Sequence, residues 1–181
     1  MPNKIDVGFS SETLEFRSRF PELHMPAYSV GDPAFLQNPN GNANAILDGE
    51  PVFLDDEGVI QKITPAIIAA NSQRRFYLAH GQPGRADTQM AQSLPIVIDD
   101  GFEIATRLVD QTDLASYTPG TAVKAGVITD ASPGGLYPAG AIGYVPADPE
   151  DEFLGTVVRV ESTQHNGTWV RIFMNRGTLP A

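Results

Sequence analysis

The stretch GTVVRVESTQHNGTWVRIFM, residues 155–174, decides the fold class. Its first part is rich in β-branched residues, and Asn166-Gly167 is a residue pair that favours a tight turn between two strands. The second part, residues 168–174, is apolar at five of its seven positions. Strands that are apolar on both faces belong in the middle of a sandwich or barrel, or beneath a partner. The stretch therefore predicts a long hairpin at the centre of a β-rich body.

Working outward, shorter runs of the same kind predict strands over residues 74–79, 94–98, 102–109, 122–129 and 142–145. Asp100-Gly101 lies between two of these runs, and an Asp-Gly pair flanked by β-branched residues favours a hairpin. Along residues 102–109 apolar side chains alternate with Glu103 and Arg107, which predicts one buried and one solvated face. Farther upstream, residues 46–47 and 52–54 form a second predicted hairpin across Asp48-Gly49. A further turn at residues 55–58 leads into 59–63.

Helix signals are few. Residues 65–73 predict a short helix with Pro65 at its first position, and one helical turn fits residues 11–19. The 17 Gly and 15 Pro residues exceed the usual share and suit short strands joined by many turns. We therefore expect a mainly β protein: a small β-barrel or sandwich body, an extended N-terminal arm, and at most one or two short helices.

The first 45 residues differ from the rest, because they contain five prolines, four of them within residues 21–39, and no apolar periodicity survives. We divide the chain into an extended arm, residues 1–45, and a β-rich body, residues 46–181, whose barrel-like part spans about 94–175. The arm carries more apolar residues than a disordered tail does, so we expect it to lie in a groove, on its own body or on a neighbouring subunit. Its candidate partner-binding anchors are Phe9, Phe16, Phe20, Tyr28 and Phe35.

Charge and composition exclude several classes of function. The 12 Lys and Arg residues against 22 Asp and Glu give a net charge of −10, which disfavours binding to nucleic acid or to anionic membranes. The chain has no cysteine, which excludes disulfides and thiolate sites. Neither a secretory signal nor an 18-residue apolar run is evident, so we expect synthesis in a cytoplasm and no membrane span.

No motif indicates catalysis. None of the three histidines, His24, His80 and His165, has a ligand partner at metal-binding spacing, and each is interpreted as a surface or turn residue. The acidic loop 146–152 offers oxygens that calcium would accept, yet it departs from the calcium-loop spacing D-x-[DN]-x-[DN]-G. We therefore expect no catalytic residue, no cofactor and no metal, and we interpret the acidic segments as turns.

The C-terminal portion from about Gly120 to Met174 reads GTAVKAGVIT, GGLYPAGAIGYVPADPEDEFLGTVVRV and GTWVRIFM. It resembles the small β-domains of tailed-bacteriophage capsid decoration (cement) proteins, in which a Lys-x-Gly element, as at Lys124-Ala125-Gly126, precedes glycine-bounded strands. The resemblance covers about a third of the chain and contains no diagnostic motif. It implies a homotrimer on the outer surface of the virion head, bound to the major capsid protein and stabilising its lattice, with no catalytic residues to carry over.

Two other functions fit the composition. A carbohydrate-binding β-module on a virion or cell surface would use Tyr137, Tyr144 and Trp169 to stack on sugar rings, provided that these side chains are exposed. A hydrolase would need two carboxylates facing each other across a cleft, and no pair among the 22 acidic residues is specified by the sequence. The sequence therefore favours a structural binding protein.

Overall fold

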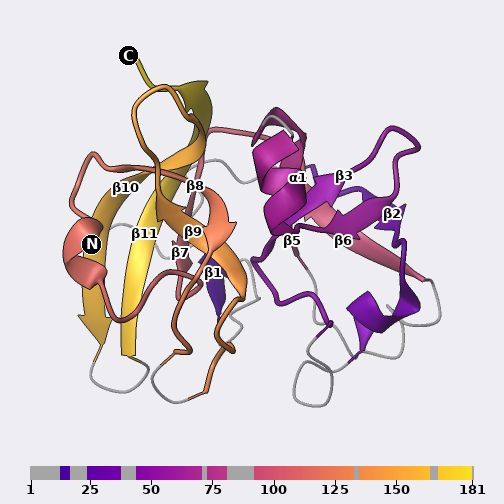
Figure 1. Cartoon of the computed structure of the whole chain (residues 1–181), viewed down its shortest axis with the longest axis horizontal. Coiled ribbons are helices and arrows are strands. Elements are labelled where there is room, and N and C mark those ends of the chain that lie inside the picture. The colour runs from indigo at the N-terminus through magenta and orange to yellow at the C-terminus, as the bar shows by residue number, and fades with distance from the viewer. Residues whose placement is uncertain are drawn as a thin grey trace.

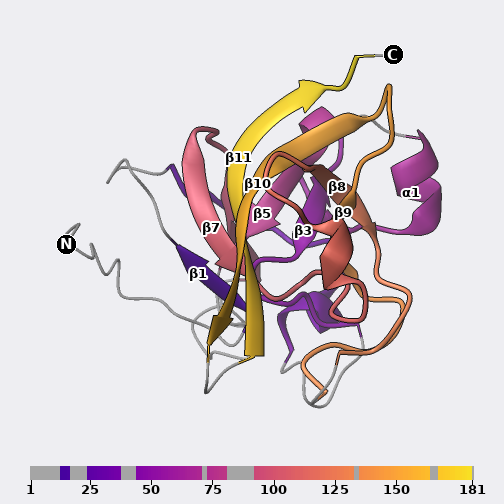
Figure 2. The ribbon, with the colours of Figure 1, turned by 90° about the vertical axis from the view of Figure 1, so that its left-hand side faces the viewer.

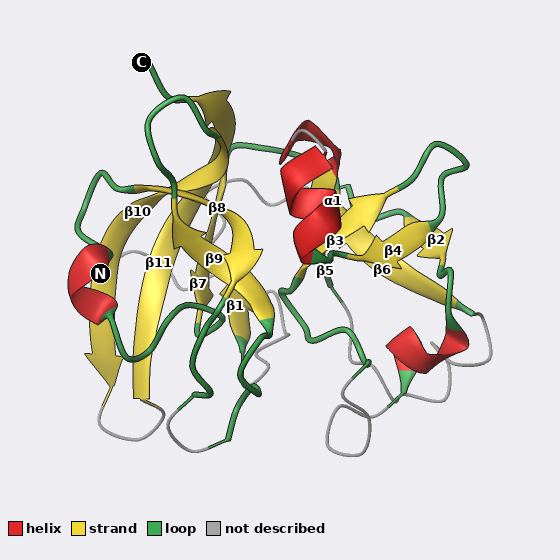
Figure 3. Cartoon of the chain, viewed as in Figure 1, coloured by secondary structure: helices red, strands yellow, loops and turns green. Residues whose placement is uncertain are grey.

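A computed structural model describes residues 13–16, 24–37, 44–70, 73–80, 92–132, 135–163 and 167–180. These residues form two antiparallel sheets, one short α-helix and three short 3-10 helices (Figure 3). The prediction of a mainly β protein with few and short helices is confirmed, and the arrangement is that of a small sandwich. Figure 1 shows the six-stranded sheet on the left and the five-stranded sheet on the right.

The six-stranded sheet has the order β1-β7-β11-β10-β8-β9. Its strands are β1 (Leu14–Phe16), β7 (Phe102–Thr106), β8 (Ala122–Val127), β9 (Ile142–Pro146), β10 (Glu152–Thr163) and β11 (Gly167–Thr178). The predicted hairpin of residues 155–174 is therefore confirmed, although both of its strands are longer than expected. β10 and β11 occupy the middle of the sheet, although Val160 on β10 is 38% exposed, so the two strands are not buried on both faces along their whole length. Figure 2 shows the long β10 and β11 beside β7.

The five-stranded sheet has the order β2-β6-β5-β3-β4. Its strands are β2 (Ala27–Ser29), β3 (Pro51–Leu54), β4 (Ile60–Lys62), β5 (Phe76–Ala79) and β6 (Ser93–Val97). The helix α1 (Pro65–Ala70) joins β4 to β5 with proline at its first position, as predicted, and ends three residues early. A parallel bridge between Val30 and Ile60 joins the two outer strands, and the Gly31 N–H donates to the Ile60 carbonyl at 2.9 Å. This bridge brings the sheet's outer strands together, as in a small barrel.

Two apolar cores follow from the alternation of side chains along the five-stranded sheet. On β5, Phe76 and Leu78 face a large core that lies between the two sheets, whereas Ala79 and the half-buried Tyr77 face a smaller one. The smaller core is made of Leu36, Ile46, Val52, Ile60, Ala79, Leu94 and Ile96. Leu36 is the last residue of the 3-10 helix η1 (Pro33–Leu36). The N-terminal segment therefore covers the face of the five-stranded sheet that points away from the six-stranded sheet.

The predicted hairpin around Asp100-Gly101 is wrong. β6 and β7 flank this turn but belong to different sheets, so the turn carries the chain from one sheet to the other. Gly101 adopts φ 84°, which glycine tolerates, and its N–H donates to the Met174 carbonyl at 2.7 Å. The residue pair thus supplies the expected local turn, while pairing with β11 and β5 draws its two flanking strands apart. The range 94–175 therefore begins in one sheet and ends in the other.

The hairpin predicted across Asp48-Gly49 is also wrong, because residues 46–47 form no strand. Instead, β3 pairs with β4 through the turn at residues 55–58 and with β5 on its other side. Ile46 donates its N–H to the Phe35 carbonyl at 2.9 Å, and its side chain fills the smaller core. Burial of one large apolar side chain outweighs a strand pairing of two residues.

Two further predictions need correction. β7 is buried at all five positions, including Glu103, which is 2% exposed, so neither of its faces is solvated. Arg171 on the neighbouring β11 pairs with Glu103 and makes this burial possible. The helical turn expected within residues 11–19 is absent from the described residues 13–16, which instead contain the edge strand β1. Leu14 is fully buried there, and β7 satisfies the backbone of the strand.

Candidate partner-binding site

The described part of the arm is built into both sheets of its own chain. β1 pairs with β7 in the register Leu14 to Thr106, and β2 pairs with β6 in the register Tyr28 to Leu94. Thus a single N-terminal segment supplies an edge strand to each sheet. Thr106 reinforces the first contact, because its hydroxyl donates to the Thr13 carbonyl at 3.1 Å.

The predicted anchor residues lie in different places. Tyr28 and Phe35 are half-buried against the smaller core of the same chain, so only part of each side chain is open to a partner. Phe16 belongs to β1 by its backbone. Phe9 and Phe20 lie outside the described residues. The structure therefore brings Tyr28 and Phe35 together on the five-stranded sheet and separates them from β1.

Residues 45–50, which link the arm to β3, contact both β1 and the six-stranded sheet. The Thr13 hydroxyl donates to the Asp48 carbonyl at 2.7 Å, and the Tyr144 hydroxyl on β9 donates to the Gly49 carbonyl at 3.1 Å. Gly49 has φ 83°, and a Cβ atom there would lie 3.0 Å from the Cβ of Leu14. Only glycine therefore meets both the backbone conformation and the close approach of β1. We call residues 45–50 the arm junction.

Two residues of the arm junction, Asp48 and Glu50, are buried carboxylates that each form an ion pair. Glu50 is 1% exposed, and its Oε1 lies 3.5 Å from Lys62 Nζ, while its Oε2 accepts the Leu47 N–H at 2.8 Å. Lys62 also donates to the Ala45 carbonyl at 2.7 Å. Burial raises the pKa of Glu50 to about 7, and the Lys62 charge offsets part of that rise.

The second buried pair joins Asp48 and His80, whose Oδ1 and Nδ1 atoms lie 3.3 Å apart. His80 is 9% exposed, so its interpretation as a surface residue is wrong. His24 is exposed and pairs with Asp99, and the His24 N–H lowers the pKa of that carboxyl. His165 lies outside the described residues. Neither buried pair has a sequence signal, because Asp48 and Glu50 lie in a turn-like segment and their partners Lys62 and His80 are distant in sequence.

The acidic loop 146–152 is organised by a lysine. Lys124 Nζ lies 2.5 Å from Asp151 Oδ2, which also accepts the Asp148 N–H at 2.8 Å. The hydrogen bond from Lys124 lowers the pKa of the Asp151 carboxyl. Across the described residues no three His, Asp or Glu side chains are grouped as metal ligands.

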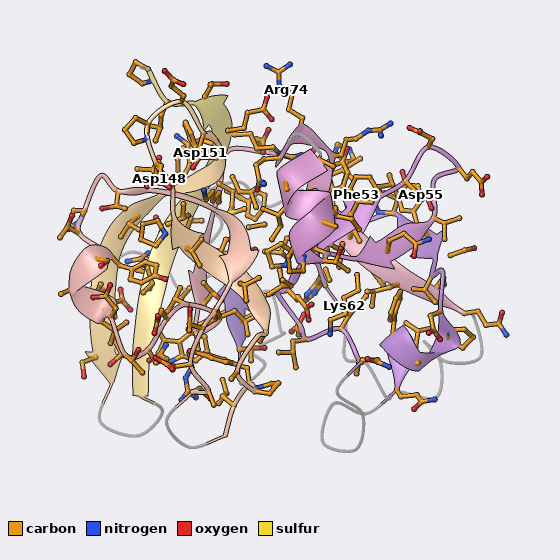
Figure 4. All side chains as sticks on the ribbon, viewed as in Figure 1. Phe53, Asp55, Lys62, Arg74, Asp148 and Asp151 are labelled. Atoms are coloured by element: carbon orange, nitrogen blue, oxygen red, sulfur yellow. The ribbon has the colours of Figure 1, made fainter. Side chains whose placement is uncertain are left out.

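The other acidic turn closes the β3–β4 hairpin. Asp55 Oδ1 accepts the Val59 N–H at 2.9 Å, and its Oδ2 accepts from Gln61 at 3.0 Å, which lowers the pKa of the Asp55 carboxyl. Arg75 pairs with Asp56 and lies over the Phe53 ring at 5.9 Å. Figure 4 shows Asp55 far from Asp148 and Asp151, so the acidic turns do not converge. Each acts as a local structural element.

The three aromatic residues proposed for sugar stacking are buried. Tyr144 is 0% exposed, Tyr137 is 2% exposed and Trp169 is 8% exposed. The Tyr137 hydroxyl donates to the Val109 carbonyl at 2.5 Å and the Tyr144 hydroxyl to Gly49, so both tyrosines bind backbone within the chain. These side chains therefore form no exposed platform for a sugar ring.

Arg176 on β11 connects the two sheets, and sequence reasoning missed it. Its guanidinium donates to Asp100 Oδ1 at 2.9 Å and to the carbonyls of Arg74 and Phe76 at 3.0 Å each. It also lies 4.8 Å from the centre of the Tyr77 ring. A cavity of about 10 Å³ beside this arginine has room for one water molecule and none for an organic ligand. Arg176 therefore has a structural role at the sheet junction.

No known protein family, curated protein or solved structure matches this chain. Among the described residues, no helix combines the length and the apolar character that crossing a bilayer requires.

Proposed function

We propose that this protein is a structural component of a phage virion, a capsid decoration protein that acts by binding and carries out no reaction. It would bind as a homotrimer to the outer surface of the head and hold neighbouring major capsid subunits together. The resemblance of residues 120–174 to such proteins supports this proposal. Closed trimers also suit the threefold positions of an icosahedral shell, because one contact is then made three times.

The arm is the structural observation that carries the proposal. It lies across two sheets and adds a strand to each, at β1 and β2. Strand addition is a general way for an extended segment to bind a sheet edge, since the backbone supplies affinity and the side chains supply specificity. Exchange of the arm between copies would make these same strand pairings between neighbouring subunits and so hold the subunits together.

The test is cosedimentation of the purified protein with heads that lack it. Removing all of residues 1–45 would delete β1, β2 and the core residue Leu36, so a loss of binding would be confounded by unfolding. A variant that begins at Thr13 keeps β1, β2 and Leu36. A change in its binding to heads can therefore be assigned to residues 1–12 and not to unfolding. Light scattering provides the control for assembly, with three times the chain mass of 19.4 kDa expected. A monomer that fails to sediment with heads would refute the proposal.

A further inference from the structure

One arginine stands apart from the other described cations. Seven of the eight Lys and Arg residues in the described part of the chain lie within ion-pair distance of a carboxylate: Lys62, Arg74, Arg75, Lys124, Arg159, Arg171 and Arg176. Arg107 is the eighth, and the described residues give it no carboxylate. In a chain of net charge −10, an unneutralised cation is unexpected.

Arg107 is held against the only tryptophan of the chain. It follows β7, its N–H donates to the Thr13 carbonyl at 3.0 Å, and its guanidinium carbon lies 5.8 Å from the centre of the Trp169 ring. Gln111 fixes the two strands beside this contact, because its Nε2 donates to the carbonyls of Arg107 and Thr168, at 3.2 Å each. The fold therefore fixes the Arg107 backbone, and the half-buried Arg107 side chain lies against the Trp169 ring.

The neighbouring carboxylate is already engaged. Glu161 lies opposite Trp169 in the sheet, where its Oε1 accepts from Arg159 Nε at 2.5 Å and from Arg171 Nη1 at 3.2 Å. It is thus committed to two other arginines. The half-buried Arg107 side chain lies within ion-pair distance of no carboxylate among the described residues, so its charge is not neutralised by them.

We propose that Arg107, packed against the buried Trp169 ring, binds a single carboxylate of a partner protein. A planar guanidinium matches the two oxygens of a carboxylate, and an arginine packed on a tryptophan is typical of the few residues that dominate binding energy at interfaces. Elsewhere the negative chain repels acidic groups, so one unpaired cation would fix where a partner's carboxylate docks. The carboxylate site is inferred from the structure alone, whereas the capsid as the partner that supplies the carboxylate follows from the proposed function.

Trp169 provides a direct readout of the site. Tryptophan fluorescence is recorded while acetate is titrated in place of chloride at constant ionic strength. A second titration uses phosphate, to test whether the response is specific for a carboxylate. The wild type should show a saturable response to acetate, and Arg107→Gln should show none. Arg75→Gln is the matched control, because Arg75 also lies over an aromatic ring yet pairs with Asp56. Equal responses of the wild type and Arg107→Gln, or a response to phosphate alone, would overturn the carboxylate site.

Binding to heads tests the partner separately. Arg107→Gln should weaken cosedimentation about tenfold relative to the wild type and to Arg75→Gln. Arg107→Lys keeps the charge but loses the planar fork, so it should fall between them, and it replaces Arg107→Gln if that variant fails to fold. Heads bound equally by all variants would overturn the role of Arg107 in docking. A wild type that responds to acetate but ignores heads would refute the proposed function and leave the carboxylate site supported.

Discussion

Replacing Glu50 with glutamine should remove a specific pH dependence of stability. The pKa of Glu50 is raised from 4.5 to about 7 in the folded protein, chiefly by burial. Between these two values the folded state holds a proton that the unfolded state has released, so the Glu50 contribution favours folding at low pH and weakens as pH rises to 7. One pH unit between the two pKa values corresponds to about 1.4 kcal/mol, so the whole effect is roughly 3 kcal/mol.

The assay is urea unfolding of the wild type and of Glu50→Gln, followed by circular dichroism at several pH values from 5 to 8. The series starts above the isoelectric point of about 4.6, where the protein would be least soluble. Over this range the free energy of unfolding of the wild type should fall relative to that of Glu50→Gln by roughly 2 to 3 kcal/mol. Other groups titrate in both proteins, and the difference between the two removes their contributions.

Glu57→Gln is the matched control, because Glu57 is an exposed residue of the β3–β4 turn that undergoes the same chemical change. Its curve should run parallel to that of the wild type. If the Glu50→Gln curve also runs parallel to the wild-type curve, then Glu50 is not a buried carboxyl with a raised pKa, and the reasoning about the arm junction is refuted.

Three further predictions test other parts of the structure. Leu14→Ala should lower the free energy of unfolding by about 2 to 5 kcal/mol because it empties a buried site on β1, whereas Met25→Ala, at a side chain 41% exposed, should change it by less than about 1 kcal/mol. Arg176→Gln leaves backbone carbonyls at the sheet junction without a donor and should cost about 1 to 3 kcal/mol in chemical denaturation. Lys124→Gln should raise the pKa of Asp151 toward its ordinary value in an NMR titration, with a stability change below about 1 kcal/mol because the pair is partly exposed.

The periodic elements of this fold can be read from the sequence, and their partners cannot. The hairpin of β10 and β11 follows from its length and apolar character, and β5, β8 and β9 also lie where residue patterns predict strands. Asp100-Gly101 shows the limit of such reasoning. A turn signal describes four residues, whereas the choice of sheet for β6 and β7 depends on strands that are distant in sequence.

The candidate site was harder to predict than the fold. Glu50 occurs in a segment that resembles an exposed turn, and its burial against Lys62 depends on how β4 and the arm junction pack. The aromatic anchors show the opposite difficulty, since Tyr28 and Phe35 have the composition of interface residues but contribute to the smaller core. Composition identifies apolar residues that are stabilised by burial. It does not show whether they are buried by their own chain or by another one.

The pairing of β1 with β7 has a consequence for biogenesis. Thr13 and Thr106 touch across 93 positions of sequence, so β1 leaves the ribosome long before its complementary strand exists. The central hairpin of that sheet is translated last. Each nascent chain on a messenger RNA therefore passes through an interval in which its β1 segment is exposed and unpaired. A completed sheet of one copy can pair with the β1 segment of the next copy during this interval. Exchange of N-terminal segments between copies should accordingly increase with the rate and density of translation.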